Sequence, residues 1–254
     1  MKKIVYILGS GPSLNDISEK EWKYLEDKET IGFAHIPYKN RKTKYHLATE
    51  DFPTDKDALR KIASNGYMDT LIFSHKPETC NIARQLGFNT TMIYPRKGLR
   101  NFGGKPWIHN TDVPGKLLDN FGKTIDEPLF TYRGQLSMML NFAYTLKPSE
   151  IRLIGVDLNN DEHFYDDLEE CKKLKTFHDN MQKDRPSLIG WNTNKSHATA
   201  WPSTGPYGTL VSILEIIKQL KIELNEIDIG IFVCSKKSLL YKDGILKYKG
   251  ITDV

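Results

Sequence analysis

Cysteine is scarce in this chain, and no recognisable motif uses it. The three cysteines among 254 residues are far apart, and no two of them form a Cys-x-x-Cys pair. An odd number of isolated cysteines argues against a disulfide framework and against a zinc site. The seven histidines likewise include no pair at the i, i+4 spacing of helical metal ligands. We therefore expect no bound metal.

Long apolar runs and a strong charge of either sign are also missing. The first apolar run, residues 4–8, is shorter than the roughly 7–15 apolar residues of a secretory signal. No stretch approaches the roughly 18 apolar residues of a membrane span. The net charge of +4 is too small, and Lys and Arg are too dispersed, to indicate nucleic-acid binding. We expect a cytoplasmic protein without a nucleic-acid partner, and peripheral attachment to a membrane stays open.

Several catalytic and phosphate-binding motifs are absent as well. No Gly-x-Ser-x-Gly elbow supports a serine hydrolase. The first loop, GSGPSL at residues 9–14, lacks both the third glycine of the dinucleotide fingerprint and the Gly-Lys-Ser/Thr of the P-loop. Its Gly-x-Gly could still bring backbone amides to a phosphate, with positive potential from a following helix, or it could be a tight structural turn.

What the chain does contain is a regular alternation of strand and helix patterns. Short runs rich in Ile, Val, Tyr and Phe predict strands at residues 3–8, 30–34, 45–49, 69–74, 90–94, 150–156 and 228–234. Helical patterns lie between them, starting at Ser18 and covering residues 54–66, 76–87, 134–146 and 209–222. This alternation predicts an α/β fold, a Rossmann-like, mostly parallel sheet with helices on both faces, which binds ligands at the carboxyl ends of its strands.

Two irregular segments, residues 95–128 and 158–208, interrupt the alternation. The second carries His, Tyr and Trp, and a long irregular stretch in a compact domain is usually functional or disordered. We expect a lid-like insertion there. The predicted organisation is a nucleotide-binding core at 1–157, a lid or acceptor-side insertion at 158–208, and a C-terminal helix and strand at 209–254 that complete the core.

Three further places in the sequence are candidates for chemistry. Arg133 precedes the apolar helix at 134–146, where it could bind an anion or pair with a structural carboxylate. Asp157 ends the strand at 150–156 and could bind sugar or nucleotide hydroxyls or form a solvated turn. His197 lies in the second irregular segment, as a general base or an ordinary surface histidine.

The order of these pieces resembles the bacterial family 42 sialyltransferases. A first strand ending in Gly-x-Gly-Pro-Ser-Leu, an Arg before a buried helix, a strand followed by Gly-x-Asp, and a late His occur over about residues 3–240. The related superfamily includes flagellin-modifying nonulosonic-acid transferases and hydroxymethylpterin diphosphokinase-like proteins. The resemblance implies a GT-A variant of the α/β fold and a homo-oligomer.

The resemblance also implies roles for particular residues. The catalytic set would be His197 as general base, Tyr165 and Asn159 on the leaving phosphate, and Arg133 placing the donor or acceptor. The family's cytidine-contacting asparagine, at the end of the second strand, corresponds here to Ala34 or His35. The implied nucleotide-binding residues are Gly9, Ser10, Gly11, Pro12, Ser13, Ala34, His35, Ser137, Gly155 and Asp157.

The chemistry that follows is a metal-independent transfer with inversion. The chain would move a sialic-acid-like or other keto-sugar from a CMP-sugar to a glycan hydroxyl, with the CMP-sugar as co-substrate and no cofactor. Two alternatives stay open. One is a pyrophosphokinase with Mg²⁺ on Asp157 and Asp161; the other is a non-enzymatic nucleotide- or glycan-binding module with a stacking surface around Trp191 and Trp201.

Overall fold

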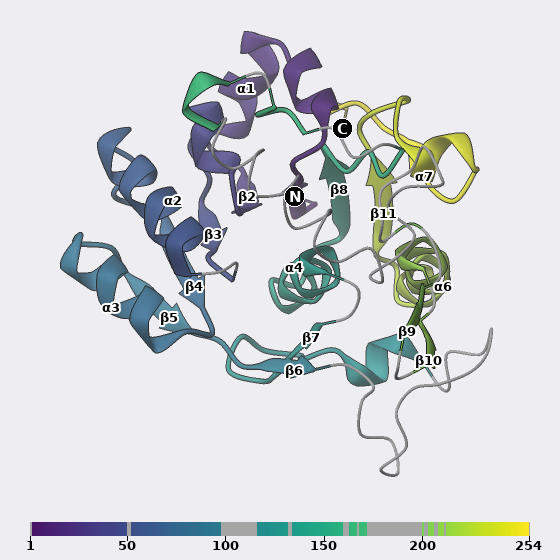
Figure 1. The fold of residues 1–254 in the computed structure, drawn as a ribbon. Coiled ribbons are helices and arrows are strands. Elements are labelled where there is room, and N and C mark those ends of the chain that lie inside the picture. Colours follow the sequence, from purple (N-terminus) through teal and green to yellow (C-terminus); the bar gives the residue numbers. More distant parts are fainter. Residues whose placement is uncertain are drawn as a thin grey trace.

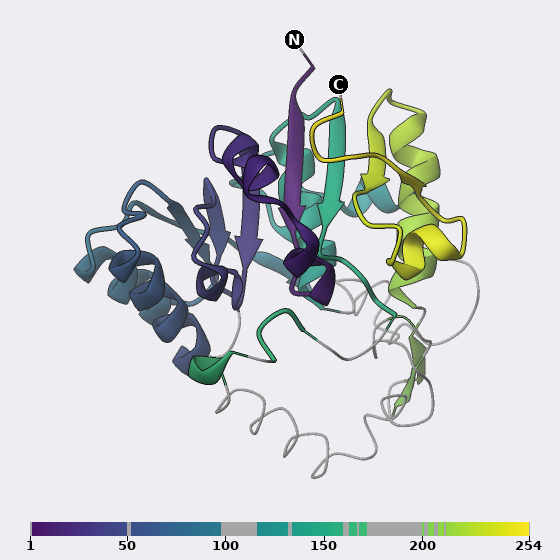
Figure 2. The same ribbon diagram turned by 90° about the horizontal axis from the view of Figure 1, so that it is seen from above.

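The structure is a computed structural model. It describes residues 2–49, 52–97, 116–131, 134–159, 163–166, 168–171, 200, 203–205, 208–210 and 212–253. Figure 1 shows a central sheet with helices on both faces, and the turned view in Figure 2 shows that the two ends of the chain lie near each other. The predicted α/β fold is therefore confirmed.

The main sheet has eight strands in the order β12-β11-β8-β1-β2-β3-β4-β5, and every neighbouring pair is parallel. All seven predicted strands belong to it, and the short edge strand β12 adds an eighth. The strands are β1 (Ile4–Leu8), β2 (Glu29–Phe33), β3 (Tyr45–Leu47), β4 (Leu71–Ser74), β5 (Thr90–Met92), β8 (Glu150–Ile154), β11 (Gly230–Val233) and β12 (Lys247–Tyr248).

Two small pairs of strands lie in the segments that the sequence analysis treats as irregular. β6 (Pro95–Lys97) pairs with β7 (Leu129–Thr131) in parallel, and β9 (Ser203–Gly205) pairs with β10 (Gly208–Leu210) as an antiparallel hairpin. Most of the predicted lid at 158–208 lies outside the described residues.

Five of the six described helices correspond to predicted ones, one of them with a shifted start, and the short α7 (Leu239–Lys242) is not predicted. The other five are α1 (Glu19–Leu25), α2 (Phe52–Ser64), α3 (Pro77–Gln85), α4 (Gln135–Thr145) and α6 (Ile213–Asn225), and the 3-10 turns are η1 (Pro12–Asp16), η2 (Ile36–Lys39), η3 (Leu117–Asn120) and η4 (Glu169–Cys171). The predicted start of α6 at residue 209 is wrong because Thr209 belongs to β10. The hydroxyl of Ser212 accepts from the Glu215 amide at 3.2 Å and starts the helix there.

Strand alternation divides the core between the two faces of the sheet. Ile7, Ile31 and Leu47 point toward α4 and α6, whereas Tyr6 and Leu8 point toward α1. α4 enters the core with residues 137–143 all buried. An apolar helix buried on nearly all sides is one that packs under a sheet, as the sequence pattern predicts for this segment.

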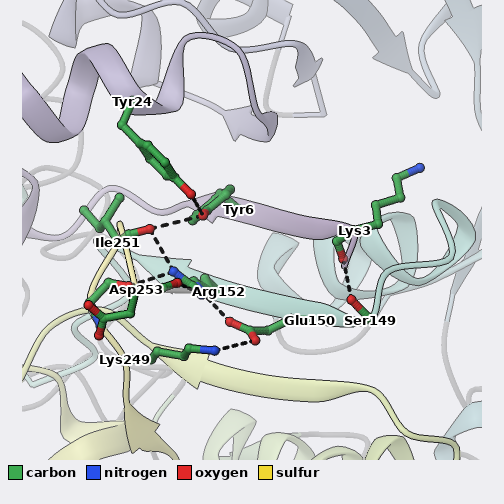
Figure 3. A network of polar contacts seen from close by, with 10 residues as sticks. Lys3, Tyr6, Tyr24, Ser149, Glu150, Arg152, Lys249, Ile251 and Asp253 are labelled. Carbon is green, nitrogen blue, oxygen red and sulfur yellow. Dashed lines mark hydrogen bonds and ion pairs between the residues drawn. The ribbon is translucent and has the colours of Figure 1, made fainter. Parts of the chain in front are cut away.

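A buried arginine ties the C-terminal segment to the middle of the sheet (Figure 3). Arg152 on β8 is fully buried and pairs with Glu150, whose other carboxylate oxygen accepts from Lys249 at 2.7 Å. Its Nη1 donates to the carbonyls of Gly250 and Ile251 at 2.7 and 2.8 Å. Burying a charge is costly unless it is fully paired, so these contacts fix residues 249–253 against β8.

Candidate functional site

The strand order reverses between β1 and β8. Strands β2 to β5 follow in chain order on one side of β1. The later strands β8 and β11 lie on its other side. Parallel α/β sheets bind ligands at such a switch point, beyond the carboxyl ends of the strands. The two loops that leave this point are residues 9–13 after β1 and residues 155–159 after β8, and both contain predicted site residues.

Three hydrogen bonds join the two loops. The amides of Gly9 and Gly11 donate to the carbonyls of Ile154 and Gly155, both at 2.7 Å. The amide of Ser13 donates to Asp157 Oδ2 at 2.8 Å. The predicted residues Gly9, Gly11, Ser13, Gly155 and Asp157 are thus brought together.

The glycines are required by this loop-to-loop contact. A Cβ on Gly9 would lie 2.4 Å from the Gly155 carbonyl oxygen, and one on Gly11 would lie 2.3 Å from Asp157 Oδ2. Gly155 itself has φ of +65°, and a Cβ there would lie 2.6 Å from Leu14 Cγ. The loop after β8 occupies the space beside Gly9 and Gly11 in which the sequence predicts a phosphate.

The α-helix expected after the first loop does not follow it directly. Pro12 opens only the five-residue η1, and α1 starts later, at Glu19. The start of α1 is closed by a capping box, in which Ser18 and Glu21 satisfy each other's backbone amides.

Three buried oxygens at the switch point have no hydrogen-bond partner in the part of the chain that the structure describes. They are Ser13 Oγ, Asp157 Oδ1 and Asn159 Oδ1. Ser13 and Asp157 are only 6% and 3% exposed. Buried polar atoms in native proteins nearly always have a partner, which can be a ligand or water. These side chains can together offer a hydroxyl and a carboxylate to a polar ligand.

Tyr165 lies next to the first loop, and its ring contacts two histidine rings. The amide of Phe164 donates to the Ser10 carbonyl at 3.0 Å, which places the segment over that loop. The Tyr165 ring centroid is 4.5 Å from that of His35, edge-on, and 4.8 Å from that of His163, nearly parallel. Tyr165 is 2% exposed. The predicted residues Ser10, His35 and Tyr165 are therefore neighbours.

Two residues at the site have left-handed backbone conformations that only glycine adopts at no steric cost. Ala34, at the end of β2, has φ of +46°, and Leu158, directly after Asp157, has φ of +58°. Strained positions of this kind gather at functional sites.

Burial and the neighbouring His35 lower the pKa of His46, on β3, to about 3, so this histidine is neutral at physiological pH.

The N-terminus of α7 supports the loop after β8 from its other side. Ser238 Oγ donates to the Val156 carbonyl at 2.6 Å, and the Leu239 amide donates to the Asp157 carbonyl at 2.7 Å. Asn159 Nδ2 donates to the Lys237 carbonyl at 2.9 Å, so one of its two N–H groups is already used. This support could not be predicted from the sequence, because nothing in residues 237–239 distinguishes them from a surface turn.

The remaining predicted residues separate into two groups. Ser137 is buried in the first turn of α4, where its hydroxyl donates to the Gly134 carbonyl at 3.0 Å. Because α4 leads into the parallel strand β8, that turn lies at the same edge of the sheet as the site. Outside the described residues lie Arg133, His197, Asp161, Trp191 and Trp201.

Neither a metal cluster nor a membrane-spanning helix is found in the described part of the chain. No three His, Cys, Asp or Glu side chains there gather as metal ligands. Within the same residues, no helix has both the length and the apolar character needed to cross a bilayer.

The fold of this chain is similar to that of several solved structures. No family model matches the chain, and no curated protein matches it by sequence. Among solved structures, the sialyltransferase CstII from Campylobacter jejuni in complex with a substrate analogue, cytidine-5'-monophosphate, matches 99% of this chain and 87% of its own, with a TM-score of 0.52 and 15% identity. Two CMP complexes of CstII variants match 98% and 97% of this chain and 86% of their own, with TM-scores of 0.51 and identities of 17% and 16%. This chain therefore has a sialyltransferase-like α/β fold over nearly its whole length.

Proposed function

We propose that this protein is an inverting, metal-independent glycosyltransferase that moves a sialic-acid-like or other keto-sugar from a CMP-sugar to a glycan hydroxyl. The observation that carries the proposal is the pair Ser13 and Asp157 at the strand-order switch point, with Ser13 Oγ and Asp157 Oδ1 buried and unpartnered among the described residues. The likeness to CMP-bound sialyltransferase structures supports the choice of nucleotide.

Ser13 and Asp157 suit different parts of a nucleoside monophosphate. A hydroxyl can donate to a phosphate oxygen, whereas a carboxylate would repel the phosphate and instead accepts hydrogen bonds from ribose hydroxyls. The amide hydrogen bond between Ser13 and Asp157 holds the two groups on adjacent loops. In this arrangement the phosphate lies on the Ser13 side and the ribose on the Asp157 side.

The leaving phosphate needs donors that are fixed before the reaction. Tyr165 supplies a hydroxyl on a ring held between His35 and His163. Asn159 supplies its second amide N–H, because the first donates to the Lys237 carbonyl. Preorganised donors of this kind stabilise developing charge in place of a metal ion.

Bond changes at the sugar complete the reaction. His197 takes the proton of the acceptor hydroxyl, and the acceptor oxygen forms a bond to the anomeric carbon. The bond from that carbon to the phosphate oxygen breaks with its electron pair, and CMP leaves with the negative charge. Arg133 orients the donor or acceptor by charge-assisted hydrogen bonds. Attack opposite the leaving group inverts the anomeric centre.

A thermal-shift screen against CMP, CDP, UDP, GDP and ATP, with and without Mg²⁺, tests the nucleotide. At a CMP concentration of 100 Kd the expected stabilisation is about 2.7 kcal/mol, a Tm increase of roughly 5–10 °C for a domain of this size. Ser13→Ala should reduce the shift, whereas Ser64→Ala, an exposed serine on α2, should leave it unchanged. A response to ATP only with Mg²⁺ would instead support the pyrophosphokinase alternative.

An assay of CMP release from a CMP-keto-sugar tests the reaction itself. Release should continue in EDTA and should fall in His197→Ala. CMP binding without any release over long incubation would contradict the transferase assignment and favour a binding module.

A further inference from the structure

A cluster of lysines lies at one edge of the fold. Residues 236–250 contain five lysines and one aspartate, a formal charge of +4, which equals the net charge of the whole chain. The segment forms α7, the following turn and β12, the outermost strand beside β11. In Figure 1, α7 lies on the opposite side of the molecule from α2 and α3.

Three of these lysines are exposed and carry no ion pair among the described residues. Lys237 pairs with Asp16 at 2.7 Å, and Lys249 pairs with Glu150 at 2.7 Å. Lys236, Lys242 and Lys247 remain. Their charge is therefore available to a partner.

Two exposed tyrosines accompany these lysines. Tyr241 on α7 and Tyr248 on β12 are 37% and 41% exposed, and their ring centroids lie 6.3 Å apart at 76°. Lys236 Nζ lies 5.0 Å from the centre of the Tyr248 ring. We call Lys236, Tyr241, Lys242, Lys247 and Tyr248 the lysine–tyrosine edge. Lysine on an edge strand also prevents unwanted strand pairing, but that role requires neither tyrosine to be exposed.

Two carboxylates near Tyr248 offset part of the positive charge of this edge, and each is held in place by local hydrogen bonds. Asp253 accepts from the Gly250 amide at 2.7 Å. Glu21 accepts from the amide and hydroxyl of Ser18 at 2.9 and 2.6 Å. Both acidic groups near the tyrosine are thus engaged in local hydrogen bonds.

The lysine–tyrosine edge adjoins the candidate site. Lys236 follows β11 by three residues, at the carboxyl edge of the sheet where the loops after β1 and β8 also lie. The next residue, Lys237, accepts from Asn159 through its carbonyl and pairs with Asp16 through its side chain. A partner bound at this edge would lie beside the site.

We propose that the lysine–tyrosine edge binds the surface of an anionic lipid bilayer. Lysines next to a negatively charged membrane attract it through their charge, and tyrosines lie at the boundary between headgroups and acyl chains. Charge complementarity and the exposed ring pair together favour a lipid surface over duplex DNA, whose phosphate backbone is bound through charge without exposed rings. The candidate site would then open next to the membrane, within reach of a membrane-bound acceptor.

Vesicle flotation tests the proposal without any assay of activity. The full chain should float with vesicles of an equal mixture of phosphatidylcholine and phosphatidylglycerol and should remain behind with phosphatidylcholine alone. The triple variant Lys236→Gln, Lys242→Gln, Lys247→Gln should lower partitioning about 100-fold, at about fivefold for each lysine. Salt at about 1 M should also release the protein, because the Debye length is then about 3 Å.

A matched variant separates this edge from net charge in general. Lys56→Gln, Arg84→Gln, Lys123→Gln removes the same charge from other parts of the surface and should change partitioning by less than about twofold, since distant charges are screened. The double variant Tyr241→Ser, Tyr248→Ser should weaken binding to anionic vesicles with little change in its salt dependence. All variants should keep the wild-type Tm.

Three results would overturn the proposal: equal binding to both vesicle types, equal losses in the two triple variants, or binding to duplex DNA without binding to anionic vesicles. None of these depends on the transferase assignment, so the two proposals can fail separately.

Discussion

Ser13 and Asp157 are 144 residues apart in the chain, yet the Ser13 amide donates a 2.8 Å hydrogen bond to Asp157 Oδ2. The contact joins the loops that leave β1 and β8. Both residues are nearly fully buried, and each has a second polar atom with no partner among the described residues. One carboxylate therefore has a structural oxygen and an oxygen available to a ligand.

Replacing Asp157 separates these two tasks. Asp157→Ala leaves the Ser13 amide buried without an acceptor and should lower the free energy of unfolding by about 1–3 kcal/mol. Asp157→Asn keeps an acceptor oxygen and should cost less, while it still removes the charge from the ribose side of the site. Urea unfolding and CMP titration of both variants measure the two effects, and equal stability of the two variants would contradict the structural task.

Gly11 should not tolerate a side chain. The methyl of Gly11→Ala would lie 2.3 Å from Asp157 Oδ2, so the two loops must separate at a cost of roughly 1–3 kcal/mol, with loss of CMP binding. Gly66→Ala is a useful comparison because its Cβ meets no atom within 4 Å. That change should cost only the left-handed backbone penalty of about 1–2 kcal/mol and should leave CMP binding intact.

His46 should make the fold sensitive to acid. Burial beside His35 lowers its pKa to about 3, whereas the unfolded chain binds the proton near pH 6.5. The unfolded state therefore binds more protons below pH 6.5, and stability is lost as the pH falls from about 6.5 toward 3. The expected loss is about 2 kcal/mol between pH 7 and pH 5.

The variant His46→Leu tests this origin of the acid sensitivity. Both ring nitrogens of His46 are buried and have no hydrogen-bond partner in the part of the chain that the structure describes, so an apolar side chain leaves no new unpaired group. Urea unfolding across this pH range should show a flatter profile for the variant. An unchanged slope would assign the acid sensitivity to other residues.

Arg152 should control the attachment of the C-terminal segment. Arg152→Ala removes one partner of a buried pair and should cost about 3–5 kcal/mol. Amide hydrogen exchange should accelerate most at residues 250–253, because the carbonyls of Gly250, Ile251 and Asp253 lose their donor. Arg152→Met fills more of the volume and should be less destabilising. Faster exchange spread evenly over the sheet would argue against a local anchoring role.

Tyr165→Phe tests the proposed donor to the leaving phosphate. Phenylalanine keeps the contacts with His35 and His163 but removes the hydroxyl. We expect kcat for CMP release to fall about 100-fold with little change in KM or stability. Tyr165→Leu should lower stability as well, because the ring contacts are lost. Unchanged kcat in the phenylalanine variant would remove the hydroxyl from the mechanism.

The sheet could be predicted from the sequence because its strands are short, apolar and separated by clear helix signals. The capping box at Ser18 and the left-handed Gly87 after α3 are local signals of this kind. β12 could not be predicted, because Lys247 and Tyr248 are exposed and show no apolar alternation. The sequence pattern predicts a helix over residues of β10, because Thr209 and Leu210 continue the apolar pattern of α6.

The candidate site could be predicted only in part, for a physical reason. The glycines of the first loop suggest close backbone approach, but the sequence does not say that the approaching group is the loop after β8. The support from Ser238 and the edge-on contact of His35 with Tyr165 depend on packing between distant segments. Such contacts leave no local pattern in the chain.

The adjacency of β1 and β8 has a consequence for how the protein folds during synthesis. Ile4 pairs with Glu150, so one edge of β1 stays open until about 150 residues have been made, which takes roughly 7–30 s at the usual rate of translation. An open edge of an apolar strand can pair with a wrong partner. The nascent chain is therefore most exposed to misassembly in this interval, and the two loops of the site can meet only at its end.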